Sequence, residues 1–332
     1  MSPPSGIQGR VFWARGLRDF GDGLAAVLLP AYLVALGYGA TEIGLVATAA
    51  LLGSALMTLA VGALGARVDP RALLLLAAAL MVATGLGFAV VASFAMLLAV
   101  ALVGTINPSA GSVSIFAPLE QAVLTGATSD AGRTMVFARY SLVGALAAAA
   151  GALAAGAPDA LAALGVAELP ALRSMFLLYA ALGLACLVAY RALPALPADA
   201  RRASHAPLGP SRGIVVKLAA LFSVDSFAGG LAVQALLALW LFGRFDLSLA
   251  QAGLFFFWSY VMAVVIPPER TAASSFTAVP RSLAAAAGPA IAGAIFASGW
   301  QTAPFILCGV LKIAYDLALL WIFRHVRPPE ER

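Results

Sequence analysis

The 332-residue chain alternates long apolar runs with short polar segments. A helix needs about 20 largely apolar residues to cross the hydrocarbon layer of a bilayer. The expected fold class is therefore all-α, that of a polytopic membrane protein. The runs predict about ten transmembrane helices, near residues 12–37, 41–64, 71–92, 94–116, 134–156, 171–191, 214–242, 250–266, 280–298 and 302–323.

A polar connector divides these helices into two groups. Residues 192–213 read ALPALPADARRASHAPLGPSRG, and their proline and arginine content is typical of a surface linker. We expect an N-terminal six-helix bundle over residues 1–191, a cytoplasmic linker over 192–213, and a shortened C-terminal bundle of about four helices over 214–332.

The composition supports a bilayer as the surrounding solvent. Hydrophobic residues make up 62% of the chain and charged residues only 11%, whereas a soluble domain carries roughly 25% charged residues. No basic run alternates with aromatic residues, so we expect no nucleic-acid partner. Cys186 and Cys308 lie in apolar runs without a nearby histidine, so neither a metal nor another cofactor is expected. The oligomeric state is left open.

The loop charges predict the orientation of the chain. With the N-terminus inside, the inner segments hold fourteen lysines and arginines, and the outer segments hold only Arg173 and Arg244. Cytoplasmic loops carry the excess of basic residues, so both termini are expected in the cytoplasm of a cell whose cytoplasmic (inner) membrane the chain crosses many times. The first apolar run contains Arg18, Asp19 and Asp22, which favours a first helix over a cleavable signal.

The two halves of the sequence resemble each other. Residues 19–45 align with 225–254, which pairs Asp19 with Asp225, and residues 132–142 align with 269–283. Parallel repeats joined by a polar linker are a recurring architecture of transporters. The alignment predicts two pseudo-symmetric helical bundles.

The repeat also indicates that the second half is shorter than the first. Leu45 and Arg133 are 88 residues apart, whereas their counterparts Leu254 and Arg270 are only 16 apart. About 70 residues, or two membrane crossings, are therefore missing, with the join near Trp258–Tyr260. A natural deletion, an engineered deletion and a gene-model error all remain open.

Between the second and third predicted helices lies the segment GALGARVDPR, residues 62–71. It resembles the Gly-x-x-x-Asp-Arg-x-Gly-Arg-type motif of the major facilitator superfamily, with Gly62, Arg67 and Arg71 in matching positions. Ala66 replaces the acidic residue, and Asp69 stands where glycine is usual. The resemblance implies two six-helix bundles around a central cavity, here internally shortened, and a conformational role for Gly62, Arg67 and Arg71. It also implies a transporter of small solutes and not an enzyme.

Charged residues inside spans cost several kcal/mol and need a partner or a wet cavity. Arg15 and Asp19, and likewise Arg18 and Asp22, are i,i+4 pairs on the first helix. They form either a proton or solute site or a structural ladder of ion pairs. A functional role is favoured for Asp19, because its repeat mate Asp225 recurs without a local cation.

Further candidates lie on other spans. Arg139 and Arg281 are near-equivalents in the repeat, and each either binds an anionic group of the solute or pairs with an inward acid such as Glu120 or Asp225. Lys312 and Asp316, spaced i,i+4, are expected to form a structural ion pair. Asn107-Pro108 and Gly111 interrupt the fourth helix, where a kink is favoured over a broken helix at a binding site.

The function predicted from these features is secondary active transport of a small solute by alternating access. No ATP-binding loop is found in the sequence, so the energy source is either an ion gradient or the solute's own gradient. Coupling to protons would use Asp19, Asp22 or Asp225. The alternative is that the shortened chain is a non-transporting truncated remnant, or a gene-model artefact, of such a transporter.

Overall fold

The computed structural model describes residues 4–64, 68–109, 114–128, 132–195, 212–265 and 274–323. These residues form α-helices, joined by turns and short irregular segments, which confirms the all-α prediction. The helices are α1 (Pro4–Ala35), α2 (Ala40–Leu64), α3 (Pro70–Val90), α4 (Phe94–Val103), α5 (Phe116–Gly126), α6 (Arg133–Ala154), α7 (Ala157–Ala163), α8 (Glu168–Arg191), α10 (Arg212–Leu231), α11 (Gln234–Phe245), α12 (Leu249–Val265), α13 (Ser274–Ala297) and α14 (Ala303–Phe323).

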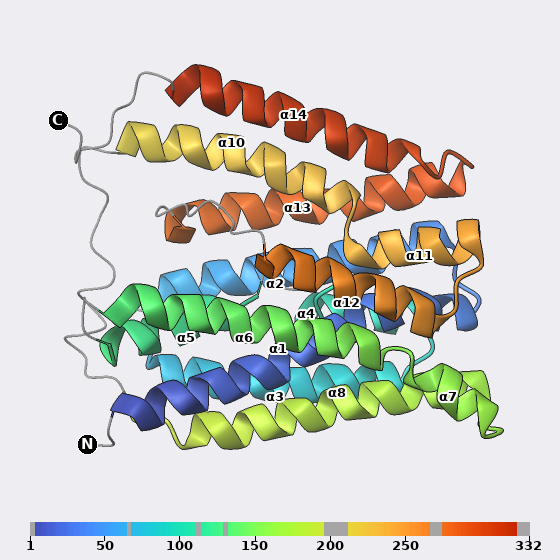
Figure 1. The fold of residues 1–332 in the computed structure, drawn as a ribbon, viewed down its shortest axis with the longest axis horizontal. Coiled ribbons are helices and arrows are strands. Elements are labelled where there is room, and N and C mark those ends of the chain that lie inside the picture. Colours follow the sequence, from blue (N-terminus) through green and yellow to red (C-terminus); the bar gives the residue numbers. More distant parts are fainter. Residues whose placement is uncertain are drawn as a thin grey trace.

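The helices run roughly along one axis, and the start of α1 and the end of α14 lie at the same end of the molecule (Figure 1). We call this the termini end, and the opposite end, where α7 lies, the far end. Six helical segments of the described chain are long and apolar enough to cross a bilayer by themselves. Shorter apolar helices, among them α4 and α12, complete the set. Most of the predicted linker 192–213, and Arg67, lie outside the described residues.

The fourth predicted span is broken and not merely kinked, which corrects the interpretation of Asn107-Pro108. Helix α4 ends at Val103, and helical structure resumes at Phe116 in α5. Proline lacks an N–H group, and the Asn107 side chain accepts a hydrogen bond from the Ser109 N–H, which holds a turn. Thr105 lies beyond the end of α4, and its backbone N–H donates a hydrogen bond to the Thr84 hydroxyl at 3.1 Å. Gly111 lies outside the described residues.

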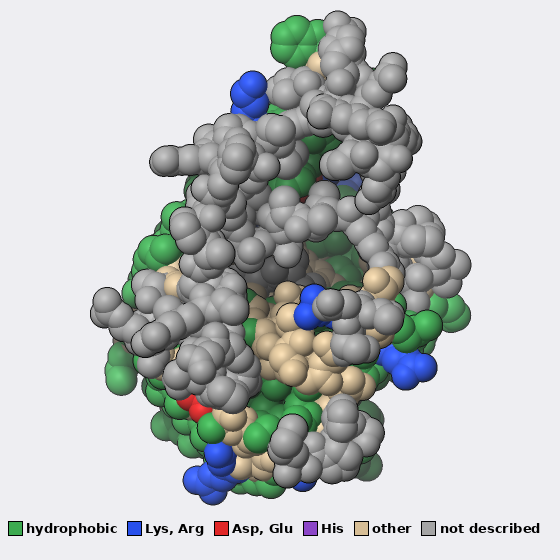
Figure 2. All heavy atoms as spheres, turned by 90° about the vertical axis from the view of Figure 1, so that its left-hand side faces the viewer, with side chains coloured by type: hydrophobic (Ala, Val, Ile, Leu, Met, Phe, Trp, Pro, Cys, Tyr) green, Lys and Arg blue, Asp and Glu red, His purple; other side chains and the backbone are tan. Residues whose placement is uncertain are grey.

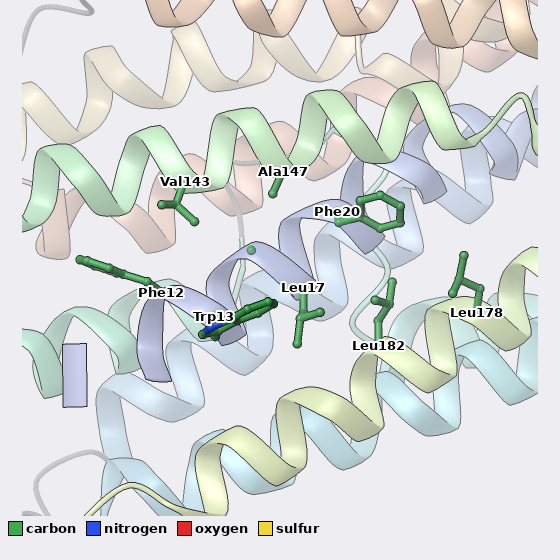
Figure 3. Close-up of a pocket in the computed structure, with 9 residues that line it drawn as sticks. Phe12, Trp13, Leu17, Phe20, Val143, Ala147, Leu178 and Leu182 are labelled. Carbon is green, nitrogen blue, oxygen red and sulfur yellow. The ribbon is translucent and has the colours of Figure 1, made fainter. Parts of the chain in front are cut away.

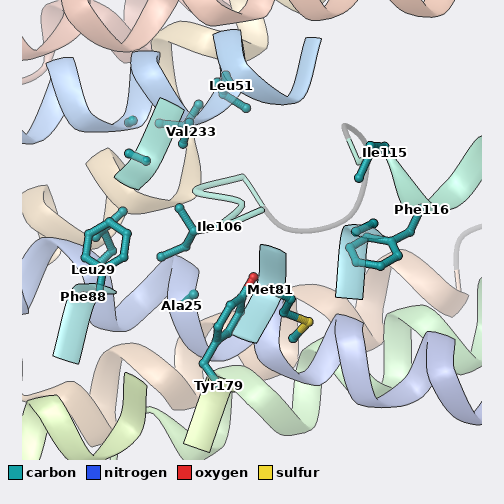
Figure 4. Packing of buried hydrophobic residues seen from close by; sticks show 14 of the residues in the cluster. Ala25, Leu29, Leu51, Met81, Phe88, Ile106, Ile115, Phe116, Tyr179 and Val233 are labelled. Carbon is teal, nitrogen blue, oxygen red and sulfur yellow. The ribbon is translucent and has the colours of Figure 1, made fainter. Parts of the chain in front are cut away.

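The seventh predicted span, 214–242, is also divided, at Ala232–Val233 between α10 and α11. The two breaks meet: the Ala235 N–H at the start of α11 donates to the Pro108 carbonyl at 3.1 Å. Ile106 and Val233, one from each break, belong to the same buried apolar cluster (Figure 4). The core thus continues from the first half of the chain into the second.

Helix packing follows the predicted repeat. In the first half α1 packs on α6 and α8, and in the second half α10 packs on α13 and α14. Between the halves α2 packs on α13, and its counterpart α12 packs on α6. Glycines allow close approaches within each half at equivalent places, Gly23 against Ala148 and Gly230 against Ala285. The pseudo-symmetry expected from Asp19 and Asp225 is therefore present in three dimensions.

Helices α3, α4 and α5 have no counterparts among the described residues of the second half. In the first half, α3 packs on α8 and α4 packs on α2. Because no such helix covers α14, only 11% of its apolar window is buried, against 39% for its counterpart α8. The shortening predicted from the spacing of the repeat is therefore a loss of the α3–α5 region.

The two halves contact each other closely at the far end. A Cβ atom on Gly44 of α2 would lie 2.4 Å from the Pro289 carbonyl oxygen of α13, and one on Gly253 of α12 would lie 2.4 Å from the Ala152 oxygen of α6. The Ala290 N–H donates to the Thr48 hydroxyl at 2.9 Å. The halves therefore meet backbone to backbone at two pseudo-symmetric places.

We predict that Gly44→Ala destabilises the protein, because its new methyl group would overlap the Pro289 carbonyl and neither backbone can move aside. Overpacking of this kind typically costs about 1–3 kcal/mol. The measurement is the thermal unfolding midpoint in detergent, followed by circular dichroism. Gly309→Ala on α14 is the control, because a Cβ there meets nothing within 4 Å. Equal midpoints for the two variants would contradict the packing described here.

Candidate functional site

Four charged residues in the middle of α1 are buried inside the first half and do not face lipid. Arg15, Arg18, Asp19 and Asp22 occupy two turns of the helix, and all four are buried. Helix α1 is enclosed by α6 and α8, and it also contacts α5, α11 and α12. The predicted i,i+4 pairing of Arg15 with Asp19 is present, with the Arg15 Nε 2.8 Å from the Asp19 Oδ2.

Arg18 is the centre of this group, and its side chain is only 1% exposed. Its guanidinium lies 2.8 Å from the Asp19 carboxylate and 3.5 Å from that of Asp22. It also lies 3.3 Å from Glu120 of α5, and it covers the ring of Phe116 at 5.1 Å. One cation therefore contacts three carboxyl groups from two helices.

Glu120 is fully buried and has further donors. The Tyr140 hydroxyl of α6 donates to it at 2.5 Å, and the Tyr190 hydroxyl of α8 donates to it at 2.6 Å. Tyr140 in turn accepts a hydrogen bond from Arg15 at 3.2 Å. The sequence interpretation missed both tyrosines. Each tyrosine lies in a span rich in alanine and leucine. Because a buried hydroxyl group needs a hydrogen-bond partner, its presence there could have indicated a polar contact inside the bundle.

We call Arg15, Arg18, Asp19, Asp22 and Glu120 the α1 cluster. It holds two guanidinium groups and three carboxyl groups, so one carboxyl group has no cation of its own. A buried group of charges is strongly favoured when it is neutral, and binding of one proton makes this cluster neutral. Asp22 is the carboxyl with the longest contact to Arg18.

The second half contains a smaller and more exposed polar group. Lys312 of α14 lies 2.6 Å from Asp225 of α10, with side chains 46% and 25% exposed. This corrects the predicted local pair of Lys312 with Asp316: a lysine that precedes its acid by four residues is poorly oriented, and packing of α10 on α14 brings Asp225 within reach. Arg281 donates to the Ser226 hydroxyl at 3.1 Å and covers the Phe222 ring.

The remaining predicted residues lie outside these groups. Arg139 is exposed on α6 and does not pair with Glu120, which contacts Arg18 and the two tyrosines. Gly62 is exposed near the end of α2. The Arg71 guanidinium donates to the Arg191 carbonyl at 2.6 Å, which ties the start of α3 to the end of α8. Asp69 accepts the Arg71 N–H at 3.1 Å and caps α3.

Two pseudo-symmetric bundles with a buried charge cluster in one of them define a polytopic helical membrane protein of the transporter class. The chain belongs to the Major Facilitator Superfamily, whose sequence model matches residues 11–225. The match ends at Asp225 in α10. It confirms the predicted family, and with it a membrane transporter of small solutes and not an enzyme.

Several solved transporter structures are similar to this chain. The human organic anion transporter MFSD10 (TETRAN) has a TM-score of 0.62 at 18% identity, over 96% of this chain and 100% of its own. The nucleoside transporter NupG has a TM-score of 0.60 at 14% identity, over 98% and 100%. A bacterial homologue of the human drug peptide transporters PepT1 and PepT2 has 0.62 at 13%, over 98% and 100%. No curated protein sequence matches the chain. At such identities the likeness extends to the fold alone.

We predict that Arg18→Gln destabilises the protein strongly, because three buried carboxyl groups lose their shared cation. Removing one partner of a buried ion pair costs about 3–5 kcal/mol. Arg139→Gln is the matched control on a neighbouring helix, and a change at this exposed position should stay within about 0.5 kcal/mol. Thermal unfolding of both variants in the same detergent makes the comparison. Similar midpoints would mean that Arg18 does not hold the cluster together.

Proposed function

We propose that this protein is a secondary active transporter that moves a small solute across the cytoplasmic membrane by alternating access and couples the movement to a proton. The observation that carries the proposal is the composition of the α1 cluster, in which three buried carboxyl groups face two guanidinium groups. Such a cluster has one proton-binding position in a region from which water is largely excluded. The proton is assigned to Asp22, whose carboxylate has the longest contact to Arg18.

The position of the cluster suggests how a proton would influence the two halves. Helix α1 contacts α11 and α12 of the second half, so a change of charge on α1 acts directly on the interface between the halves. Near this interface the Tyr260 hydroxyl donates to the Gln234 side chain at 2.7 Å. A ligand shifts a conformational equilibrium only by its different affinity for the two states. Here the proton would favour the state in which Asp22 is more completely enclosed.

An anionic solute fits the second half best. Among the described residues, the Arg281 side chain contacts a neutral hydroxyl and an aromatic ring, and neither neutralises its charge. A guanidinium group binds carboxylate or phosphate through two parallel hydrogen bonds. The similar human structure is that of an organic anion transporter. We therefore infer that Arg281 contacts an acidic group of the solute.

The proposed orientation puts the termini end in the cytoplasm. Viewed from this end, most of the coloured charged side chains are basic (Figure 2). Arg10 and Arg71 donate to the carbonyls of Ala192 and Arg191, which lie where α8 ends. The excess of basic residues on the cytoplasmic side of membrane proteins supports this orientation.

The alternative is a folded remnant that no longer transports. It is favoured by one observation, the exposure of α14 after loss of the α3–α5 counterparts. In particular Lys312 is 46% exposed inside a span, where contact of a charge with lipid is costly. The two proposals differ in whether solute crosses the membrane at all.

We predict that Asp22→Asn separates proton movement from solute movement. Purified protein in liposomes that contain a pH-sensitive dye is exposed in turn to gradients of an organic anion, a nucleoside and a dipeptide. In the wild type, one class should change the internal pH. Asp22→Asn should abolish this change and preserve exchange of labelled solute across the membrane, because the variant remains in the neutral form.

Asp316→Asn is the matched control, since Asp316 is exposed on α14 and outside the cluster. It should retain both activities. Undiminished proton movement in Asp22→Asn would exclude Asp22 as the proton site. Absence of both activities for all three solutes, with the wild type folded, would favour the remnant. Sequencing of the source DNA across the codons for Phe257–Val261 would identify a gene-model artefact.

A further inference from the structure

An apolar groove lies on the outer side of the first half, between α1, α6 and α8 (Figure 3). Its volume is about 610 Å³, within the usual range of small-molecule sites. Each of the three helices contributes to its walls, which include Phe12, Trp13, Leu17, Val143, Ala147 and Leu182. The groove lies apart from the α1 cluster, whose charged side chains are buried while Trp13 is 71% exposed.

The groove opens toward the surroundings of the protein and not toward its interior. Its walls are almost entirely carbon, and in a membrane-spanning bundle the surroundings at this depth are hydrocarbon. Water gains no hydrogen bonds from such walls, whereas an acyl chain fills the space with favourable contacts. The chemistry of the walls therefore selects an acyl chain as the occupant.

Arg139 provides a charged group at one end of this groove. It precedes Val143 by four residues and Ala147 by eight, so it lies on the same side of α6 as these two lining residues. Arg139 is exposed and is not part of the α1 cluster. It lies six residues, or about 9 Å, from the start of α6 at the termini end. An arginine at this depth extends its head group to the interface.

We propose that the groove and Arg139 together bind one anionic phospholipid, with an acyl chain between α1, α6 and α8 and the phosphate on the guanidinium group. The planar guanidinium matches two phosphate oxygens, and exposed Trp13 beside the groove is typical of the membrane interface. The proposal gives Arg139 a role outside solute contact. It does not depend on transport, because the site faces away from the α1 cluster.

The test uses Trp13 as a reporter. A variant that retains Trp13 and replaces Trp240, Trp258, Trp300 and Trp321 by phenylalanine is reconstituted in phosphatidylcholine. Lipids with brominated acyl chains then quench Trp13 when they occupy the groove. Half-maximal quenching by brominated phosphatidylglycerol should require an about fivefold lower mole fraction than quenching by brominated phosphatidylcholine, the factor expected for one arginine near the surface.

In the same background, Arg139→Gln should make the two lipids equally effective. Lys217→Gln is the matched control, since it removes an exposed charge from α10 in the other half and should leave the preference unchanged. Ala147→Phe should fill the groove and weaken quenching by both lipids. Leu146→Phe, one residue earlier and outside the groove, should have no such effect. Thermal midpoints verify that each variant is folded.

Two results would overturn the proposal. The first is equal quenching by both lipids in the parent variant, which would mean that bulk lipid alone surrounds Trp13. The second is an unchanged preference for phosphatidylglycerol in Arg139→Gln, which would place the anion elsewhere. Neither result bears on proton coupling, because the measurement requires no solute and no pH gradient.

Discussion

The buried guanidinium of Arg18 is the interaction on which the first half depends. It is shared by carboxyl groups of α1 and by Glu120 of α5. Helix α5 follows the break in the fourth span and packs on α3, and this cation ties it to α1 as well. Tyr140 and Tyr190 extend the same network to α6 and α8. A cation in a medium of low dielectric constant thus organises four helices around itself.

The fold was largely predictable from the sequence because its determinants are local or repeat along the chain. The length of the apolar runs predicted the membrane-spanning helices, and the i,i+4 spacing predicted the contact of Arg15 with Asp19. The site was less predictable, since contacts of Glu120 with tyrosines on other helices depend on packing. The break at Ala232–Val233 contains no proline and left no clear signal. The partner of Lys312 was also mispredicted, because the packing of α10 on α14 brings Asp225, and not Asp316, into contact with it.

The two halves have kept their arrangement but not their chemistry. Asp19 and Asp225 are equivalent in the repeat, yet Asp19 is 2% exposed and Asp225 is 25% exposed. The described second half has no counterpart of α5, so Asp225 has neither the cover of such a helix nor an equivalent of Glu120 nearby. Lys312 supplies the missing counter-charge from α14. The charge of Asp225 is therefore compensated by Lys312. The apolar surface of α14 is not covered in a corresponding way by the described helices.

The glycine contacts at the far end have a mechanical consequence. Gly44 against Pro289 and Gly253 against Ala152 bring backbone against backbone at two pseudo-symmetric places, because neither glycine carries a side chain. A small rotation about these two places moves no glycine side chain, so little side-chain entropy is lost at the glycines themselves. Rocking of the halves about these contacts would also move the charged groups of α1 relative to α11 and α12, both of which α1 contacts.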